Sequence, residues 1–149
     1  MRSAALLPLL ALILVACDTV GPVVDRTDVN IYELTHDADA LVGTWDLVSV
    51  TPSGECMGEN CTRTRSAEEA GQSARVTFRT DGTATYTSDD HTRAEGAYRV
   101  AYRRYENGTL SHAPRLYIGE QGYDFGIDGD RLYFEYRFVD GPLLEFARR

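Results

Sequence analysis

The stretch Leu41-Val42-Gly43-Thr44-Trp45-Asp46-Leu47-Val48-Ser49-Val50 marks the point where this chain becomes a folded domain. It follows a polar, aspartate-rich segment, and it carries the only tryptophan of the chain two positions after a glycine. Its apolar and β-branched residues favour a strand. We expect the segments downstream to be short strands that return to pair with this one.

The amino-acid composition limits the classes of protein to which this chain can belong. The chain has 149 residues, a net charge of −8 and 43% hydrophobic residues, which fits one globular domain. All fifteen basic residues are arginine. Such an acidic surface argues against nucleic-acid binding and against electrostatic docking to anionic lipids, since both need basic patches.

Tight-turn signals divide the rest of the domain into strands. Asp81-Gly82, Asn107-Gly108 and Asp128-Gly129 are strong hairpin signals. A polar loop is expected from Ser88 to Ala94. Regular turns without intervening helices predict an all-β fold, an eight-stranded antiparallel up-and-down β-barrel. The expected strands are Thr44–Thr51, Ala74–Arg79, Thr83–Thr87, Gly96–Arg103, Arg115–Ile118, Tyr123–Ile127, Arg131–Phe138 and Leu143–Arg148.

Side chains alternate between the two faces of a strand, so the pattern also predicts the barrel interior. This interior is aromatic and rich in tyrosine. Its hydroxyls either reach water at the barrel mouth or orient a ligand in a cavity, because a buried hydroxyl needs a partner. The residues expected to line it are Tyr86, Tyr98, Val100, Tyr102, Leu116, Ile118, Tyr123, Phe125, Phe134 and Tyr136.

The N-terminus has the features of a secretory leader. Arg2 precedes an apolar run, Ala4–Ala16, too short to span a bilayer as a mature helix. The run ends in Leu14-Val15-Ala16-Cys17, which resembles the bacterial lipobox. The resemblance implies a signal peptide over 1–16 and a Cys17 that carries lipid, including palmitate. It also implies anchoring in the bacterial cell envelope, at the periplasmic face or the outer membrane.

Residues 17–40 are expected to form the lipidated cysteine and a flexible tether ahead of the barrel domain at 41–149. Within this segment, residues from Ile31 could instead form one or two helical turns that plug a barrel end. Cys56 and Cys61 remain as an even pair outside the cytosol, where oxidising conditions favour a disulfide.

Three motifs give the domain a family resemblance. Gly43-Thr44-Trp45 is similar to the Gly-x-Trp signature of lipocalins, and Phe78-Arg79-Thr80-Asp81-Gly82-Thr83 and Leu144-Glu145-Phe146-Ala147-Arg148 look like the bacterial lipocalin-like lipoproteins. The resemblance implies that Trp45 closes the barrel floor and that an arginine of the last strand packs over it. Barrel closure brings Arg148 beside Trp45, so these two form the expected structural pair.

No catalytic, metal-binding or phosphate-binding motif is present, so we expect neither enzyme activity, a cofactor nor a metal. The mixed run Tyr98–Tyr105 suits a half-buried strand better than a nucleic-acid platform. Two functions stay open for a monomer. The first is a membrane-anchored module that binds a small hydrophobic or amphipathic ligand in its barrel. The second is a filled barrel that serves as an envelope structural or protein-interaction part, such as an inhibitor.

Overall fold

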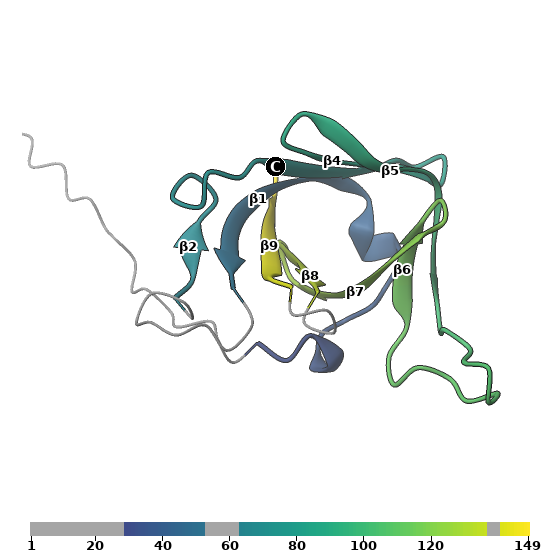
Figure 1. Cartoon of the computed structure of the whole chain (residues 1–149). Coiled ribbons are helices and arrows are strands. Elements are labelled where there is room, and N and C mark those ends of the chain that lie inside the picture. Colours follow the sequence, from purple (N-terminus) through teal and green to yellow (C-terminus); the bar gives the residue numbers. More distant parts are fainter. Residues whose placement is uncertain (1–28, 53–62, 137–140) are drawn as a thin grey trace, which may run out of the picture.

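The computed structural model describes residues 29–52, 63–136 and 141–149. Eight antiparallel strands form a closed barrel, in which the first strand pairs with the last (Figure 1). One further short strand, β2, extends the sheet beside β1. The elements are η2 (Ile31–Glu33), η3 (Asp39–Leu41), β1 (Gly43–Thr51), β2 (Arg65–Ser66), β3 (Ala74–Phe78), β4 (Thr83–Ser88), β5 (His91–Ala101), β6 (Arg115–Ile118), β7 (Gln121–Asp128), β8 (Arg131–Glu135) and β9 (Leu143–Arg148).

The barrel confirms the predicted fold class, and its turns follow the predicted chemistry at most positions. In the β3–β4 turn the Asp81 carboxylate accepts hydrogen bonds from the backbone N of Thr83 at 2.9 Å and from its hydroxyl at 2.7 Å. Gly82 supplies the positive φ of 82°. An aspartate side chain that accepts a bond from the backbone two residues later mimics a backbone turn, and so favours the turn at this position.

The expected polar loop from Ser88 to Ala94 is wrong. Asp89 and Asp90 form a two-residue turn, with φ values of 49° and 63°. Positive φ at both central residues is typical of the tight hairpin turn that matches strand twist. Aspartate tolerates this backbone region better than most residues. Strand β5 therefore starts at His91 and pairs with β4 along its first half.

A β-bulge keeps the inner face of β1 apolar. The pairing between β1 and β9 shifts between Leu47 and Ser49, so Val48 is the extra residue. An extra residue shifts the side-chain alternation along the strand by one position. Val50 therefore faces the interior and is 3% exposed. Ser49 faces outward instead, and its hydroxyl donates to the Glu145 carboxylate at 2.6 Å.

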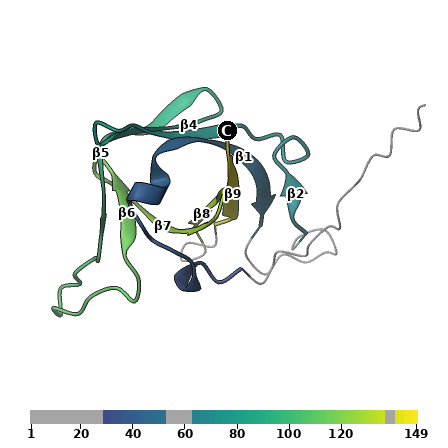
Figure 2. The ribbon, with the colours of Figure 1, turned by 180° about the vertical axis from the view of Figure 1, so that it is seen from behind.

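A strap formed by residues 29–42 runs from the outer wall into one barrel end. Ile31 in η2 is fully buried on the outer wall against Tyr133 and Leu143. The strap then bridges Ile127 through Thr35. In Figures 1 and 2, η3 lies within the ring of strands, and its Leu41 belongs to the main core. Helical turns near Ile31 are therefore present, but η2 covers the wall while η3 enters the barrel.

Glycine at one position makes room for this strap. A Cβ atom at Gly126 would lie 2.8 Å from the carbonyl oxygen of Ile31 and 2.9 Å from the Cβ of Leu34. Side chains in real proteins essentially never approach so closely. The bare backbone of β7 thus lets the strap lie flat against the barrel.

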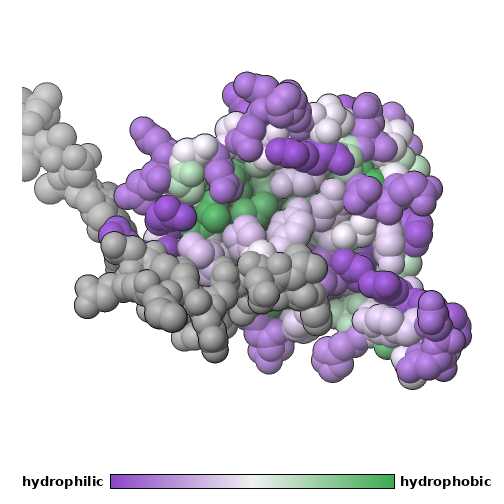
Figure 3. Space-filling model, viewed as in Figure 1, coloured by the Kyte–Doolittle hydropathy of each residue, from purple (hydrophilic) through white to green (hydrophobic). Residues whose placement is uncertain are grey.

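Several sequence predictions concern residues outside the described ranges: the leader, the lipidated Cys17 and the pair Cys56–Cys61. They stay predictions. In the described part of the chain, no helix is both long and apolar enough to cross a bilayer. On the face of the molecule shown in Figure 3, polar colours dominate the periphery, the centre is pale, and the strongest apolar colour lies left of the centre.

Candidate binding surfaces

The barrel is sealed where β1 begins and β9 ends, and we call this region the closed end. The indole of Trp45 is fully buried, and its Nε1 donates to the carbonyl oxygen of Leu41 at 2.7 Å. The Arg148 guanidinium carbon lies 4.1 Å from the centroid of the indole. The predicted contact between Trp45 and Arg148 is present, because these two residues are direct partners in the β1–β9 ladder.

Arg148 also holds the strap in place. Its Nη1 donates to the carbonyl of Val42 at 2.6 Å, its Nη2 to that of Ala40 at 2.7 Å, and its Nε lies 3.2 Å from the carboxylate of Asp130. The planar guanidinium group of Arg148 can interact with all three acceptors and stack on the Trp45 indole at the same time. Gly43, with φ of 136°, leaves space for this fork, since a Cβ there would lie 2.9 Å from Nη1. The closed end is a structural joint whose polar groups are already used.

Aromatic side chains pack the centre of the barrel interior. The residues predicted to line it share one cluster, with the exception of Tyr102. Phe134 and Phe146 have no accessible surface and their ring centroids lie 5.2 Å apart. Tyr123 stacks on Phe134 at 5.0 Å. A void that could hold water would leave accessible surface on its lining. Aromatic side chains thus pack the centre of the interior, while Tyr98, Val100 and Tyr136 of its lining are only partly buried.

Two of the interior tyrosine hydroxyls are hydrogen-bond partners of each other. A hydrogen bond joins the hydroxyls of Tyr86 and Tyr136. Burial raises the pKa of both phenols, and burial together with the nearby Tyr86 raises the pKa of Tyr123 to about 12. A phenol with a raised pKa stays neutral near pH 7, as expected for hydroxyls in a packed core.

Tyr102 corrects the predicted lining. Its side chain is 54% exposed, because β5 ends at Ala101 and the chain continues beyond the barrel. Residues 102–114 form a second short ladder, which we call the hairpin extension. The bridge between Arg104 and Leu110 and the bond from the backbone N of Tyr105 to the carbonyl of Thr109, 2.9 Å long, hold it together. Tyr102 continues the inner face of β5, but no opposite wall covers it there.

A groove of about 620 Å³ lies between the hairpin extension, the barrel wall and the strap, and we call it the hairpin groove. Its volume falls in the range of small-molecule sites. Arg115 and Asp124 form an ion pair of 2.6 Å in it, and the Arg103 guanidinium lies 5.3 Å from the Tyr105 ring. The lining residues are Tyr32, Arg103, Tyr105, Ser111, His112, Ala113, Arg115 and Asp124.

The strap and the extension meet in this groove. The rings of Tyr32 and His112 lie edge to face, with centroids 6.1 Å apart. Arg103 has no carboxylate partner among the residues that the structure describes, which leaves its charge available to a ligand. The groove therefore combines aromatic surface, one available cation and one neutralised ion pair. This mixture suits an amphipathic molecule with an anionic group.

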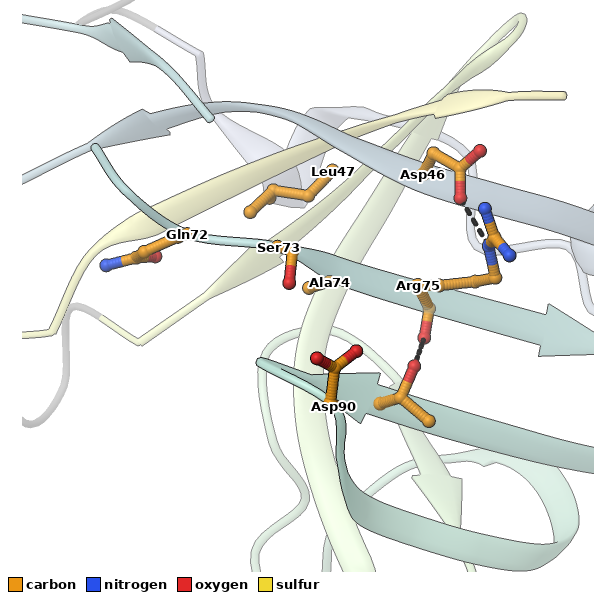
Figure 4. A pocket seen from close by; sticks show the side chains of 8 residues that line it. Asp46, Leu47, Gln72, Ser73, Ala74, Arg75 and Asp90 are labelled. Atoms are coloured by element: carbon orange, nitrogen blue, oxygen red, sulfur yellow. Dashed lines mark hydrogen bonds and ion pairs between the residues drawn. The ribbon is translucent and has the colours of Figure 1, made fainter. Parts of the chain in front are cut away.

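A second hollow, the wall pocket, has about 360 Å³ and lies where β1 separates from β3 (Figure 4). The two strands pair only up to Asp46 and Arg75, whose side chains form an ion pair of 2.5 Å. Leu47 and Ala74 at its base pack against the core, while Ser73 and Asp90 make its rim polar. Its open, mostly polar lining makes it a weaker candidate than the hairpin groove.

Sequence reasoning did not find the hairpin groove. Asn107-Gly108 indicates the turn, and the alternation of arginine and tyrosine before it is visible in the sequence. Neither feature shows that Tyr32, far away in the chain, would pack against His112. Among the described residues, no group of three or more His, Cys, Asp or Glu side chains is placed to hold a metal ion.

Comparison of the chain with protein-family models, with curated proteins and with solved structures gave no match. Function is therefore argued from the residues themselves.

Proposed function

We propose that this protein is a lipid-anchored, lipocalin-like binding module without enzyme activity, and that its ligand site is the hairpin groove. The observation that carries the proposal is the contrast between the two candidate sites. Buried aromatic side chains pack the centre of the interior, whereas the groove offers about 620 Å³ beside an aromatic wall and a cation. Ligand sites in proteins are concave, largely apolar and carry few polar groups.

The closed end supports the family part of this proposal. Gly43, Trp45 and Arg148 come together as the lipocalin resemblance implies, from opposite ends of the domain. The lipobox resemblance at Cys17 supports the anchor, and it would place the module at the envelope membrane. The ligand class that fits the groove is a small amphipathic molecule with an apolar body and one anionic group.

Native mass spectrometry of the protein purified from its own host tests this function. We expect a small molecule to remain bound to the wild-type chain and to be lost from the variants Arg103→Ala and Tyr105→Ala. Both side chains are exposed, so these changes should leave the barrel folded. Arg99→Ala is the matched control, because Arg99 also stacks on a tyrosine, Tyr117, but outside the groove. Ligand loss in the control as well would contradict the assignment.

The filled interior also favours a second function, that of a rigid barrel that presents its surface to another protein. Three large hydrophobic side chains of the described residues are exposed, and all lie on the hairpin extension: Tyr102, Tyr105 and Leu110. Exposed apolar side chains that cluster often mark interaction sites. Purified protein without a small molecule, but with a stoichiometric protein partner that Leu110→Asp releases, would support this function instead.

A further inference from the structure

The apolar surface of the hairpin groove consists mainly of rings. Tyr32 belongs to the strap, and Tyr105 and His112 belong to the two arms of the hairpin extension. The only other apolar side chain among the described residues of the lining is the methyl group of Ala113. Strand alternation explains this composition, because the aliphatic residues of β6, such as Leu116, point into the barrel and are buried. The groove therefore offers a ligand ring faces and ring edges rather than aliphatic chains.

Most polar side chains of the lining already have partners within the protein. Arg115 and Asp124 form an ion pair of 2.6 Å, and both side chains are mostly buried. The Ser111 hydroxyl donates to the carbonyl of Ala113 at 2.7 Å and accepts from the backbone N of Arg103 at 3.0 Å. The guanidinium group of Arg103, in contrast, has neither an ion pair nor a hydrogen bond with another residue that the structure describes. A ligand in the groove therefore meets one available positive charge.

This single charge selects the anionic group of the ligand. The planar fork of an arginine matches a carboxylate, with which it forms two parallel hydrogen bonds. A carboxylate carries one negative charge, and the guanidinium of Arg103 balances it. A polyanion would need further cations, and the net charge of −8 on the chain would repel it. A monocarboxylate therefore fits the groove.

The position of the carboxylate determines where the rest of the ligand lies. Arg103 and Tyr105 both line the groove, and two residues along a strand are about 7 Å apart. The guanidinium carbon of Arg103 lies 5.3 Å from the centroid of the Tyr105 ring. The backbone of Tyr105 is held by hydrogen bonds to Thr109 and Gly108, each 2.9 Å long. A ring attached to the carboxylate, directly or through one methylene group, therefore lies beside the ring of Tyr105.

A rigid planar ligand suits these rings better than an acyl chain. Aromatic rings gain from offset-stacked and edge-to-face contacts in addition to the area that they bury, and an alkyl chain lacks this contribution. The groove already holds one edge-to-face pair, Tyr32 and His112, whose centroids lie 6.1 Å apart. An acyl chain also loses the freedom of its many torsions on binding, whereas a fused ring system has none to lose.

We propose that the hairpin groove selects a planar aromatic monocarboxylate. Arg103 holds its carboxylate, and the ring packs against Tyr105 and the pair of Tyr32 and His112. This inference rests on the proposed ligand site and adds the chemical class of the ligand. Acyl-chain amphiphiles bind the same groove more weakly, because its lining gives them neither aliphatic partners nor ring contacts.

Equilibrium dialysis of the full chain against three probes tests the inference. Naphthoate has the planar ring system and the charge. Naphthamide keeps the shape without the charge, and decanoate keeps the charge on a flexible chain. We expect naphthoate to bind about ten times more tightly than either of the other probes.

Two variants assign this preference to the groove. Arg103→Gln should weaken naphthoate binding to the level of naphthamide, because the charge is lost. Tyr105→Leu keeps an apolar side chain without a ring, and should remove most of the preference for naphthoate over decanoate. The matched controls are Arg99→Gln and Tyr117→Leu, which change an arginine–tyrosine pair of 4.1 Å outside the groove and should leave all three affinities unchanged.

The outcomes separate the ligand class from the ligand site. Decanoate that binds as tightly as naphthoate, and is weakened by Arg103→Gln, would overturn the aromatic class and leave the groove as the site. Equal binding of naphthoate and naphthamide would overturn the role of the carboxylate. Naphthoate binding that neither groove variant weakens would overturn the groove and the proposed function together. No binding of any probe would overturn the inference alone, and native mass spectrometry would then decide the proposed function.

Discussion

The closed end and the hairpin extension each place an arginine on an aromatic ring, and they differ in what surrounds it. Arg148 lies 4.1 Å from the centroid of a fully buried indole and uses its other donors on Ala40 and Val42. Arg103 lies 5.3 Å from the ring of Tyr105, which is 45% exposed. The same pair of side-chain types therefore closes a barrel at one place and borders a groove at the other.

This contrast in burial indicates that one region of the molecule stabilises the fold and the other is open to binding. A cation on an aromatic ring contributes more when it is desolvated, so the closed end stabilises the fold. The extension leaves its cation and its apolar side chains exposed to solvent, where they contribute little to folding and remain available to a binding partner. Variants at the two sites should accordingly change different measurements.

The largest effect is expected for Trp45→Ala. The change removes a fully buried indole, its hydrogen bond to Leu41 and the surface under Arg148. We expect the free energy of unfolding to fall by about 3–5 kcal/mol, as for other aromatic-to-alanine changes in cores. Urea unfolding followed by far-UV circular dichroism measures this loss. A loss below 1 kcal/mol would mean that the closed end is not the structural joint described here.

A double-mutant cycle separates the stacking from the rest. Trp45→Ala and Arg148→Ala together should cost less than the sum of the single changes, with a coupling energy of about 2 kcal/mol. Arg99 and Tyr117 provide the control, since their separation is also 4.1 Å but Arg99 is exposed. Their coupling should be about 0.5–1 kcal/mol. Equal coupling in the two pairs would contradict the role given to burial.

A smaller loss is expected for Gly126→Ala, which tests the strap. The new methyl group would collide with the backbone of Ile31 and with Leu34, so the strap must move off the wall. We expect a loss of about 1–3 kcal/mol, typical of overpacking, and faster hydrogen exchange in the strap. Gly122→Ala is the control, because its close neighbour is the side chain of Tyr117 rather than backbone. Unchanged exchange in Gly126→Ala would argue against strap contact.

The sequence predicts the closed end much better than the groove, for a physical reason. Trp45 and Arg148 face each other because the first and last strands must pair, and hairpin turns such as Asp81-Gly82 set the number of strands. Asp89-Asp90 lacks the usual glycine, so the turn there was not predicted. The groove depends on the contact between Tyr32 and His112, which no local pattern encodes.

The dependence of stability on alkaline pH tests whether the tyrosines of the interior are packed, in contrast to those of the open groove. The pKa of Tyr123 is raised to about 12 by burial, so the folded protein holds this proton more tightly than the unfolded chain does. Its contribution to stability is complete below about pH 10, the unfolded value, and is lost as the pH rises towards 12. Tyr123→Phe should flatten the fall in stability over this range. Tyr105→Phe, an exposed control, shows the effect of losing a hydroxyl outside the core.

The smallest expected effect is an acid dependence of the strap. The Nε2 atom of His36 is buried without a hydrogen-bond partner, and its ring lies 5.1 Å from that of Phe125. Burial lowers the pKa of His36, while the carbonyls of Phe125 and Leu34 partly offset this shift. Below about pH 6.5 the unfolded chain takes up this proton more readily than the folded one. Stability should fall with the pH until the folded pKa is passed.

His36→Gln should remove this acid-dependent part of the unfolding free energy, whereas His91→Gln, at an exposed position, should keep it. Hydrogen exchange at pH 5 and pH 7 should show the wild-type strap opening first, since His36 lies on it between η2 and η3. Tyr32 belongs to the same strap and lines the groove, so acid should weaken ligand retention as well. Ligand retention that is independent of pH, in a strap that does open, would separate the groove from the strap.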